Sequence, residues 1–155
     1  MKATPTAPKL KTRTLIGNID FVEDYTYFEV KILRTDETSN ILIGVLDPKV
    51  YSSSASLGLF NRSWTVCIAN GKKYANASSS FLSKPEPAAG SFVGVFLNQK
   101  EKTVSFNLNG EIKANVFKDV SGPLRAGVEL FSNIDQVVLD PQPSAIPQAF
   151  LEKVI

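Results

Sequence analysis

Hydrophobic and polar residues alternate along short stretches of this chain, a pattern typical of β-strands that bury one face. After Thr26 we expect Phe28, Val30 and Ile32 to face the core. The alternate residues Tyr27, Glu29 and Lys31 are expected to face outward. Residues 40–46 (NILIGVL) are apolar at both parities. This run predicts a central strand that is covered on both of its faces.

Residues 90–110 (GSFVGVFLNQKEKTVSFNLNG) predict a β-meander. An apolar strand is followed by a polar turn, a second alternating strand and the pair Asn109-Gly110. Asn-Gly tolerates the positive φ angles of a type I′ turn, so it is a strong hairpin signal between β-type segments. Residues 64–74 follow the same style and place a second Asn-Gly pair after a strand.

The strand from Trp64 to Ala69 is predicted to turn Trp64 into the core and its small residues Thr65, Cys67 and Ala69 outward. A solvated face normally carries longer polar side chains, so small outward residues leave room for a ligand. The alternative is that the N-terminal segment or the loop 51–63 covers this face.

The rest of the chain adds loops and two closing strands. Residues 51–63 and 75–90 are predicted to be long loops, and residues 124–131 and 135–139 to be strands. Helical periodicity is absent, apart from a short turn expected near the C-terminal end. The chain therefore reads as all-β, a sandwich or barrel of short strands.

Composition and charge narrow the function classes. The 155 residues are 43% hydrophobic and 21% charged, which predicts one globular domain. Neither a membrane-spanning run nor a signal-peptide block is seen, and the lone Cys67 cannot form an internal disulfide. We therefore expect an intracellular, cytoplasmic domain without membrane insertion. The net charge of +2 comes from a basic N-terminal stretch before Asp20, with no basic patch of the kind that binds nucleic acid.

The chain contains no histidine and one cysteine. This excludes Ser-His-Asp and Cys-His nucleophile systems, histidine-ligated metals and thiolate zinc cages. We therefore predict a protein that is not an enzyme and that has no metal site and no cofactor.

Seven segments follow one another in the order and spacing of a known family. They are Tyr27-Phe28-Glu29-Val30, Ile43-Gly44-Val45, Ser63-Trp64-Thr65-Val66, Asn70-Gly71-Lys72-Lys73-Tyr74, Val93-Gly94-Val95-Phe96-Leu97, Thr103-Val104-Ser105-Phe106 and Gly122-Pro123-Leu124-Arg125. Together they resemble the SPRY domain, the PRY–SPRY module of tripartite-motif ubiquitin ligases and butyrophilins, over about residues 25–140. The PRY stretch itself is not recognisable in residues 1–24, and Cys67 and Ala69 stand where several ligases place bulky aromatics.

The resemblance implies a bent, antiparallel two-sheet β-sandwich of the concanavalin-like SPRY type at residues 13–141. A flexible lead-in (1–12) and a C-terminal tail (142–155) would flank it. The domain would be a monomer that binds a protein or peptide through loops on one face, as the substrate-recognition part of an E3 ubiquitin ligase. The binding positions that carry over are Asp47, Lys49, Tyr51, Cys67, Ala69, Asn70, Phe131, Ser132 and Asn133.

Two other function classes were weighed. A lectin-like carbohydrate-binding module would need exposed aromatics and Asp/Asn loops, often around calcium, and no Asp cluster with that ligand spacing is found. A glycoside hydrolase would need two carboxylates facing across a cleft, and no strand shows such a pattern. The lectin-like module is the alternative to the protein-interaction domain.

Overall fold

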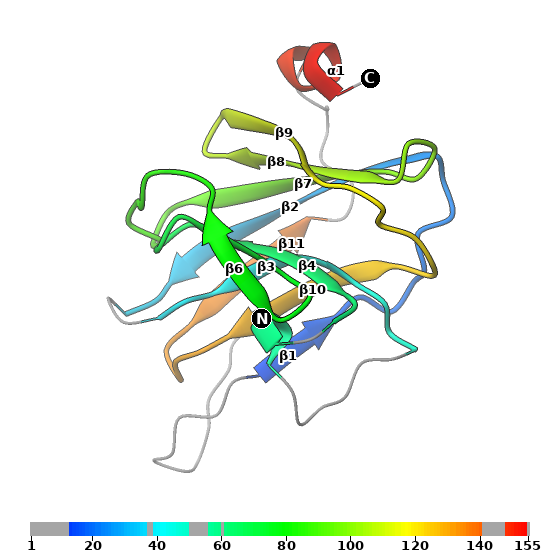
Figure 1. Cartoon of the computed structure of the whole chain (residues 1–155). Helices are drawn as coiled ribbons and strands as arrows, with labels where there is room; N and C mark the ends of the chain where they lie inside the picture. Colours follow the sequence, from blue (N-terminus) through cyan, green and yellow to red (C-terminus); the bar gives the residue numbers. More distant parts are fainter. Residues whose placement is uncertain (1–12, 37–38, 50–55, 60, 141–147, 155) are drawn as a thin grey trace.

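The computed structural model describes residues 13–36, 39–49, 56–59, 61–140 and 148–154. Within them the chain forms eleven β-strands, one 3₁₀ helix and one α-helix. The strands make two antiparallel sheets that pack face to face (Figure 1). The all-β, two-sheet sandwich expected from the sequence is confirmed.

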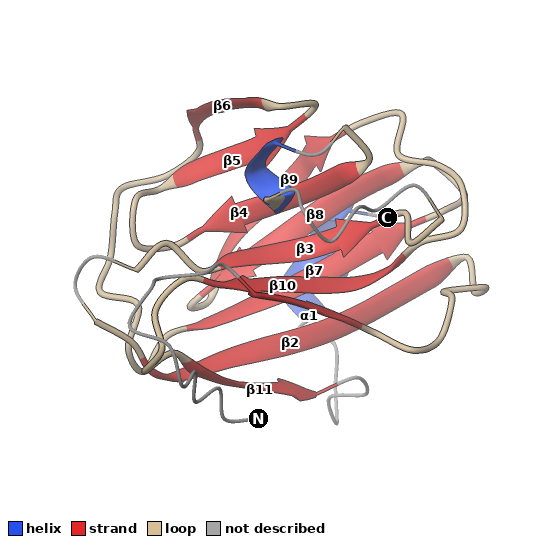
Figure 2. Ribbon diagram, turned by 90° about the horizontal axis from the view of Figure 1, so that it is seen from below, coloured by secondary structure: helices blue, strands red, loops and turns tan. Residues whose placement is uncertain are grey.

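The first sheet has six strands in the order β1-β10-β3-β4-β5-β6. Their bounds are β1 (Arg13–Ile16), β10 (Arg125–Leu130), β3 (Leu42–Leu46), β4 (Ser63–Cys67), β5 (Lys72–Ala75) and β6 (Ser78–Phe81). The strands β3, β4 and β10 lie in its middle, and the edge strand β6 lies beyond β5 (Figure 2).

The second sheet has five strands in the order β11-β2-β7-β8-β9. Their bounds are β11 (Gln136–Asp140), β2 (Tyr25–Arg34), β7 (Phe92–Asn98), β8 (Thr103–Leu108) and β9 (Glu111–Phe117). The β8–β9 turn has positive φ at Asn109 (54°) and at Gly110 (96°), so the predicted Asn-Gly hairpin is confirmed.

The core lies between the two sheets. Phe28, Val30 and Ile32 are at most 1% exposed, as their alternation predicts, and Trp64 is 5% exposed in the same cluster. Burying these apolar side chains is the main favourable contribution to the stability of such a sandwich.

The outer face of the six-stranded sheet is covered by the 3₁₀ helix η1 (Leu57–Leu59). Leu57 packs there with Leu42, Leu46 and Cys67. The prediction that Thr65 and Cys67 are open to a ligand is therefore wrong, since their exposures are 0% and 2%. The alternative, in which the loop 51–63 covers this face, is confirmed for its described residue Leu57.

The outer face of the five-stranded sheet is covered in part by helix α1 (Gln148–Val154). Phe150 is fully buried against Tyr27 and Phe96, with ring centroids 5.4 and 5.2 Å away. Tyr27 was expected to face outward. It points to the outer face but is only 5% exposed, because it packs beneath the helix.

One predicted loop contains a strand. Residues 78–81, inside the expected loop 75–90, pair with β5 as the edge strand β6. All four residues are exposed and three of them are serine, so no hydrophobic alternation marks the strand in the sequence.

Candidate functional site

Four loops meet at one end of the sandwich, which we call the loop end. They connect β2 to β3 (35–41), β4 to β5 (68–71), β6 to β7 (82–91) and β10 to β11 (131–135). The antiparallel register brings the start of β3 beside the ends of β4 and β10. Backbone hydrogen bonds tie the loops together, from Glu86 N to Ile68 O (3.0 Å) and from Gly90 N to Ile32 O (2.9 Å).

Asp135 holds two of these loops together. Its fully buried carboxylate accepts hydrogen bonds from the backbone N–H groups of Phe131 (2.8 Å) and Ser132 (2.7 Å). The Thr35 hydroxyl donates to the other carboxylate oxygen at 2.8 Å. A buried carboxylate with several donors is a strong positioning element, so the β2–β3 and β10–β11 loops are set relative to one another.

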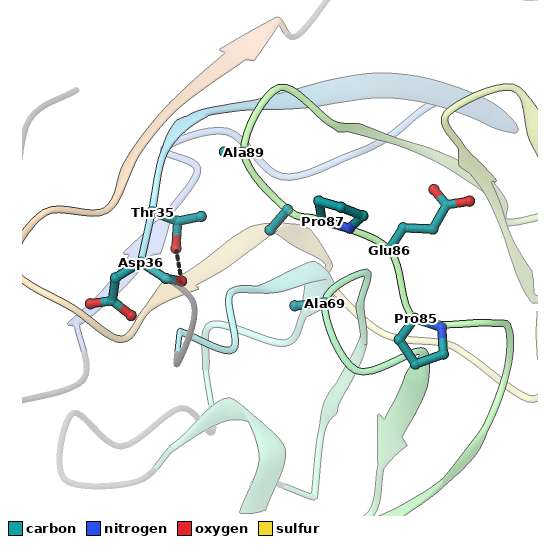
Figure 3. Close-up of a pocket in the computed structure, with 8 residues that line it drawn as sticks. Thr35, Asp36, Ala69, Pro85, Glu86, Pro87 and Ala89 are labelled. Carbon is teal, nitrogen blue, oxygen red and sulfur yellow. Dashed lines mark hydrogen bonds between the residues drawn. The ribbon is translucent and has the colours of Figure 1, made fainter.

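A first hollow of about 420 Å³ opens between the β2–β3 and β6–β7 loops. Figure 3 shows Thr35 and Asp36 on one side of it and residues 85–89 on the other, with Ala69 between them and the Asp36 carboxylate turned away from residues 85–89. Most of the lining is apolar, and its charged members are the acidic residues Asp36 and Glu86. The Glu86 carboxylate accepts a hydrogen bond from the Asn109 side-chain amide at 2.9 Å.

A second hollow of about 240 Å³ lies on the outer face of the six-stranded sheet, beside the loop end. It is lined by Asn40, Leu42, Ser56, Gly58, Tyr74, Glu129 and Phe131. The Glu129 residue is only 3% exposed, and its carboxylate accepts hydrogen bonds from the Ser56 hydroxyl (2.8 Å) and from Leu57 N (2.6 Å). Burial raises the pKa of Glu129, and these two donors act in the opposite direction.

Six of the nine predicted positions gather at the loop end. Ala69 lines the first hollow and Phe131 lines the second. In the β10–β11 loop, Ser132 is buried and Asn133 is exposed. The Ser132 carbonyl accepts a hydrogen bond from the Arg13 guanidinium at 2.8 Å.

Two of the six support the lining of the second hollow rather than forming it. The Asn70 amide donates to the Tyr74 hydroxyl at 2.7 Å, and the Cys67 thiol donates weakly to the Asn40 carbonyl at 3.7 Å. Both acceptors line the hollow. Burial raises the pKa of the Cys67 thiol, so it stays neutral and unreactive at physiological pH.

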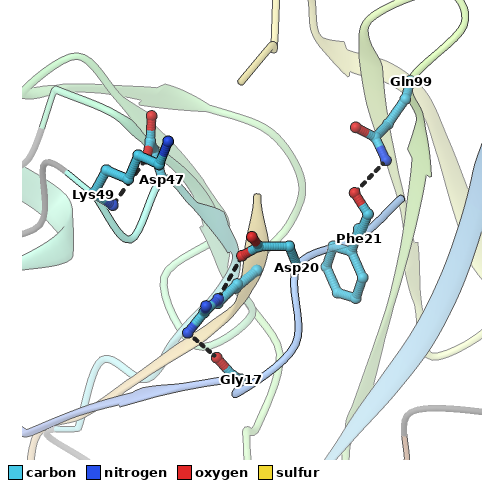
Figure 4. Close-up of polar contacts among 7 residues, drawn as sticks. Gly17, Asp20, Phe21, Asp47, Lys49 and Gln99 are labelled. Carbon is cyan, nitrogen blue, oxygen red and sulfur yellow. Dashed lines mark hydrogen bonds and ion pairs between the residues drawn. The ribbon is translucent and has the colours of Figure 1, made fainter. Parts of the chain in front are cut away.

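Asp47 and Lys49 lie at the opposite end of the sandwich. Leu46, the last residue of β3, pairs with Ser63, whereas the loop end is at the other end of this five-residue strand, about 13 Å away. Figure 4 shows the Asp47 carboxylate accepting a hydrogen bond from Lys49 N (2.9 Å), in the same region as the Asp20–Arg125 ion pair. The structure therefore does not bring these two positions together with the other six. Tyr51 lies outside the described residues.

Several loop-end residues were missed by the sequence analysis. No motif marks Thr35, Glu129, Asp135 or the segment 85–89 in the sequence. These residues become visible as a site only when distant segments are packed together.

Among the described residues, no group of three or more histidine, cysteine, aspartate or glutamate side chains stands together in a way that could hold a metal ion. Within the same part of the chain, no helix is long and apolar enough to cross a membrane.

Comparison with known proteins assigns this architecture to a family. The family model of the SPRY domain matches residues 25–140. Among solved structures, the SPRY domain of human HERC1 superposes with a TM-score of 0.73 at 18% sequence identity, over 86% of this chain and 85% of that one. This likeness agrees with the two-sheet fold described above.

Proposed function

The chain belongs to the SPRY domain family, and we propose that it is a non-catalytic module that binds a peptide or protein epitope at the loop end. SPRY domains are in general protein–protein interaction modules. The observation that carries the proposal is the meeting of four loops around two hollows, with the buried Asp135 carboxylate holding two of the loops in place.

The sizes of the two hollows favour side-chain anchors over a small-molecule ligand. At about 420 and 240 Å³ they lie at or below the low end of typical small-molecule pockets, which are roughly 300–1,000 Å³. Each hollow has room for one or two side chains. In protein interfaces a few anchored side chains carry most of the binding energy, and the polar contacts around them set the register.

We further propose that the domain supplies substrate recognition to an E3 ubiquitin ligase. The support is the sequence resemblance to the PRY–SPRY module of tripartite-motif ligases. Membership of that subgroup, an intracellular cytoplasmic location and a monomeric state all remain predictions. Isolation of the full-length parent protein together with a ubiquitin-transfer domain would test the ligase role directly.

The loop end can be tested with two matched substitutions. Ala89 is exposed and lines the first hollow, so Ala89→Arg should fill its mouth without disturbing the core. Ala114 is exposed on β9, outside both hollows, and Ala114→Arg is the control. Ala69 is less suitable, because it is half-buried and packs against the core cluster.

The native domain and the two variants are used as bait in cell lysate, and captured proteins are quantified by mass spectrometry. We expect at least one protein to be retained by the native and Ala114→Arg forms and lost with Ala89→Arg. With that protein purified, calorimetry should show an affinity loss of about tenfold or more for Ala89→Arg alone. Equal capture by all three forms would contradict a binding role for the loop end, and a glycan array would then test the lectin-like alternative.

A further inference from the structure

The second hollow contains a buried carboxylate with no cation beside it. Within the described part of the chain, the ion pairs are Asp47–Arg62, Glu111–Lys113 and Asp20–Arg125, and none includes Glu129. In the β1–β10 ladder Thr14 is the direct partner of Glu129, and Arg13 is the residue before Thr14. The Arg13 guanidinium, however, donates a hydrogen bond to the Ser132 carbonyl. Burying a carboxylate without a cationic partner costs free energy of folding. A cation that enters the hollow would offset this cost.

Glu129 keeps η1 in place, but this contact leaves part of the carboxylate unused. An ionised carboxylate has about four acceptor positions. Two of them are taken, one by the Ser56 hydroxyl and one by Leu57 N. Glu129 also lines the hollow directly, so the remaining capacity is open to a donor that enters it.

The other lining residues suit the same kind of donor. Tyr74 and Phe131 contribute aromatic rings, and Asn40 contributes an exposed amide at the mouth. Rings attract cations through their electron-rich faces, and an anionic oxygen next to them adds charge complementarity. The lining offers hydrogen-bond acceptors and aromatic rings, and among the described residues it contains no basic side chain that would repel a cation.

We infer that the second hollow binds a basic side chain of the protein ligand, preferably arginine, with the Glu129 carboxylate as its counter-ion. This inference rests on the proposed function and names the chemistry of one anchor. Arginine is favoured over lysine because its planar guanidinium is weakly hydrated, can form two parallel hydrogen bonds with a carboxylate and stacks on rings. The volume of about 240 Å³ matches one such side chain rather than a whole ligand.

The probe is a random peptide library displayed on phage and selected on the intact native chain. We expect the selected peptides to share an arginine at one position. In a synthetic copy of the best peptide, citrulline replaces that arginine, because it keeps the shape and removes the charge. The native protein should lose about ten- to a hundredfold in affinity for the citrulline peptide, as expected for a charge-assisted hydrogen bond.

Protein variants complete a double-mutant cycle. Glu129→Gln should reduce the affinity for the arginine peptide by a similar factor and should make arginine and citrulline nearly equivalent. Glu111→Gln, a change of the same type at an exposed strand position, is the control and should leave the preference intact. If Glu129→Gln does not fold, Asn40→Arg places a guanidinium at the mouth from the chain itself and should block the arginine peptide while the melting temperature is kept.

The possible failures are distinguishable. Selected peptides without a shared basic residue, or a citrulline penalty that is equal on native protein and Glu129→Gln, would overturn this inference. If such peptides still lose binding to Ala89→Arg, the proposed function stands. Enrichment of no peptide, together with equal capture by all bait forms, would overturn the proposed function and the inference with it.

Discussion

The Thr35 hydroxyl donates a 2.8 Å hydrogen bond to the buried carboxylate of Asp135, a residue one hundred positions further along the chain. The same carboxylate accepts hydrogen bonds from the backbone N–H groups of Phe131 and Ser132. One side chain therefore joins two of the loops that form the candidate site, directly beside the pairing of Gln136 with Arg34 in the β2–β11 ladder.

Replacing Asp135 should destabilise the protein and loosen the loop end together. Asp135→Ala removes the acceptor of two backbone N–H groups, that of Ser132 being buried, and the shorter of the two hydrogen bonds of the Thr35 hydroxyl, which predicts a loss of about 2–4 kcal/mol in the free energy of unfolding. Urea denaturation measures this loss, and Asp24→Asn at an exposed position is the control. Unchanged stability, with unchanged amide exchange at residues 131–133, would contradict the role given to Asp135.

Gly44 should not tolerate a side chain. A Cβ at this position would lie 1.9 Å from the Trp64 carbonyl oxygen, which belongs to the backbone of the neighbouring strand and cannot move aside. Gly44→Ala should therefore cost about 3 kcal/mol or more, or prevent folding. At Gly17 a Cβ would meet only ordinary contacts at 3.5 Å, so Gly17→Ala is the matched control. Similar melting temperatures for the two variants would refute the close approach of β3 and β4.

Helix α1 should depend on a single anchor. A seven-residue helix is too short to persist alone, so it forms through the packing of Phe150 against Tyr27 and Phe96. Phe150→Ala should lower the free energy of unfolding by about 3 kcal/mol and abolish amide protection in residues 148–154. Glu152→Ala, an exposed change in the same helix, should do neither. Retained protection in the Phe150 variant would show that other contacts hold the helix.

Thr65 offers a stabilising substitution. Its hydroxyl oxygen is buried under η1, and it has no hydrogen-bond partner among the described residues. Thr65→Val keeps the side-chain shape and removes the unsatisfied group, so we expect a gain of about 1 kcal/mol and a higher melting temperature. A loss of stability would indicate a partner for the hydroxyl elsewhere in the chain.

Glu129 should make stability depend on pH. Burial raises its pKa in the folded protein above the ordinary value of 4.5, so the folded state binds this proton more tightly than the unfolded state does. Stability relative to a Glu129→Gln variant should therefore fall as pH rises from about 4.5 through the raised pKa, and level off above it. Denaturation curves for both proteins between pH 4 and pH 8 measure the difference. Parallel curves would contradict a raised pKa.

Much of the fold was predictable from local patterns. The alternation of Phe28, Val30 and Ile32 identified the inward face of β2, and Asn109-Gly110 identified the β8–β9 hairpin. Such signals are local, because the side-chain period of a strand and the φ angles of a turn depend on neighbouring residues alone. The order of the short motifs was enough to suggest the family that the comparison then established.

The candidate site was predictable only in part. Parity alone could not show that Thr65 and Cys67 are covered, because the cover comes from η1, a segment outside that strand. The positions 47 and 49 were grouped with residues 131–133, yet the antiparallel register places them at opposite ends of the sheet. Which end a loop joins depends on how the whole sheet pairs.

The sequence by itself therefore determined most of the strands, the inward face of β2, the Asn109-Gly110 turn and the family. Each of these depends on interactions between residues close in the chain or on a recognisable order of short motifs. Only the tertiary structure decided which outer faces are covered and which loops meet. It also decided that Glu129 meets Leu57 and that Asp135 meets Thr35, since these two contacts span 72 and 100 residues. Such long-range contacts leave no periodic trace in the sequence, because they depend on which strands pair and on which segment covers an outer face.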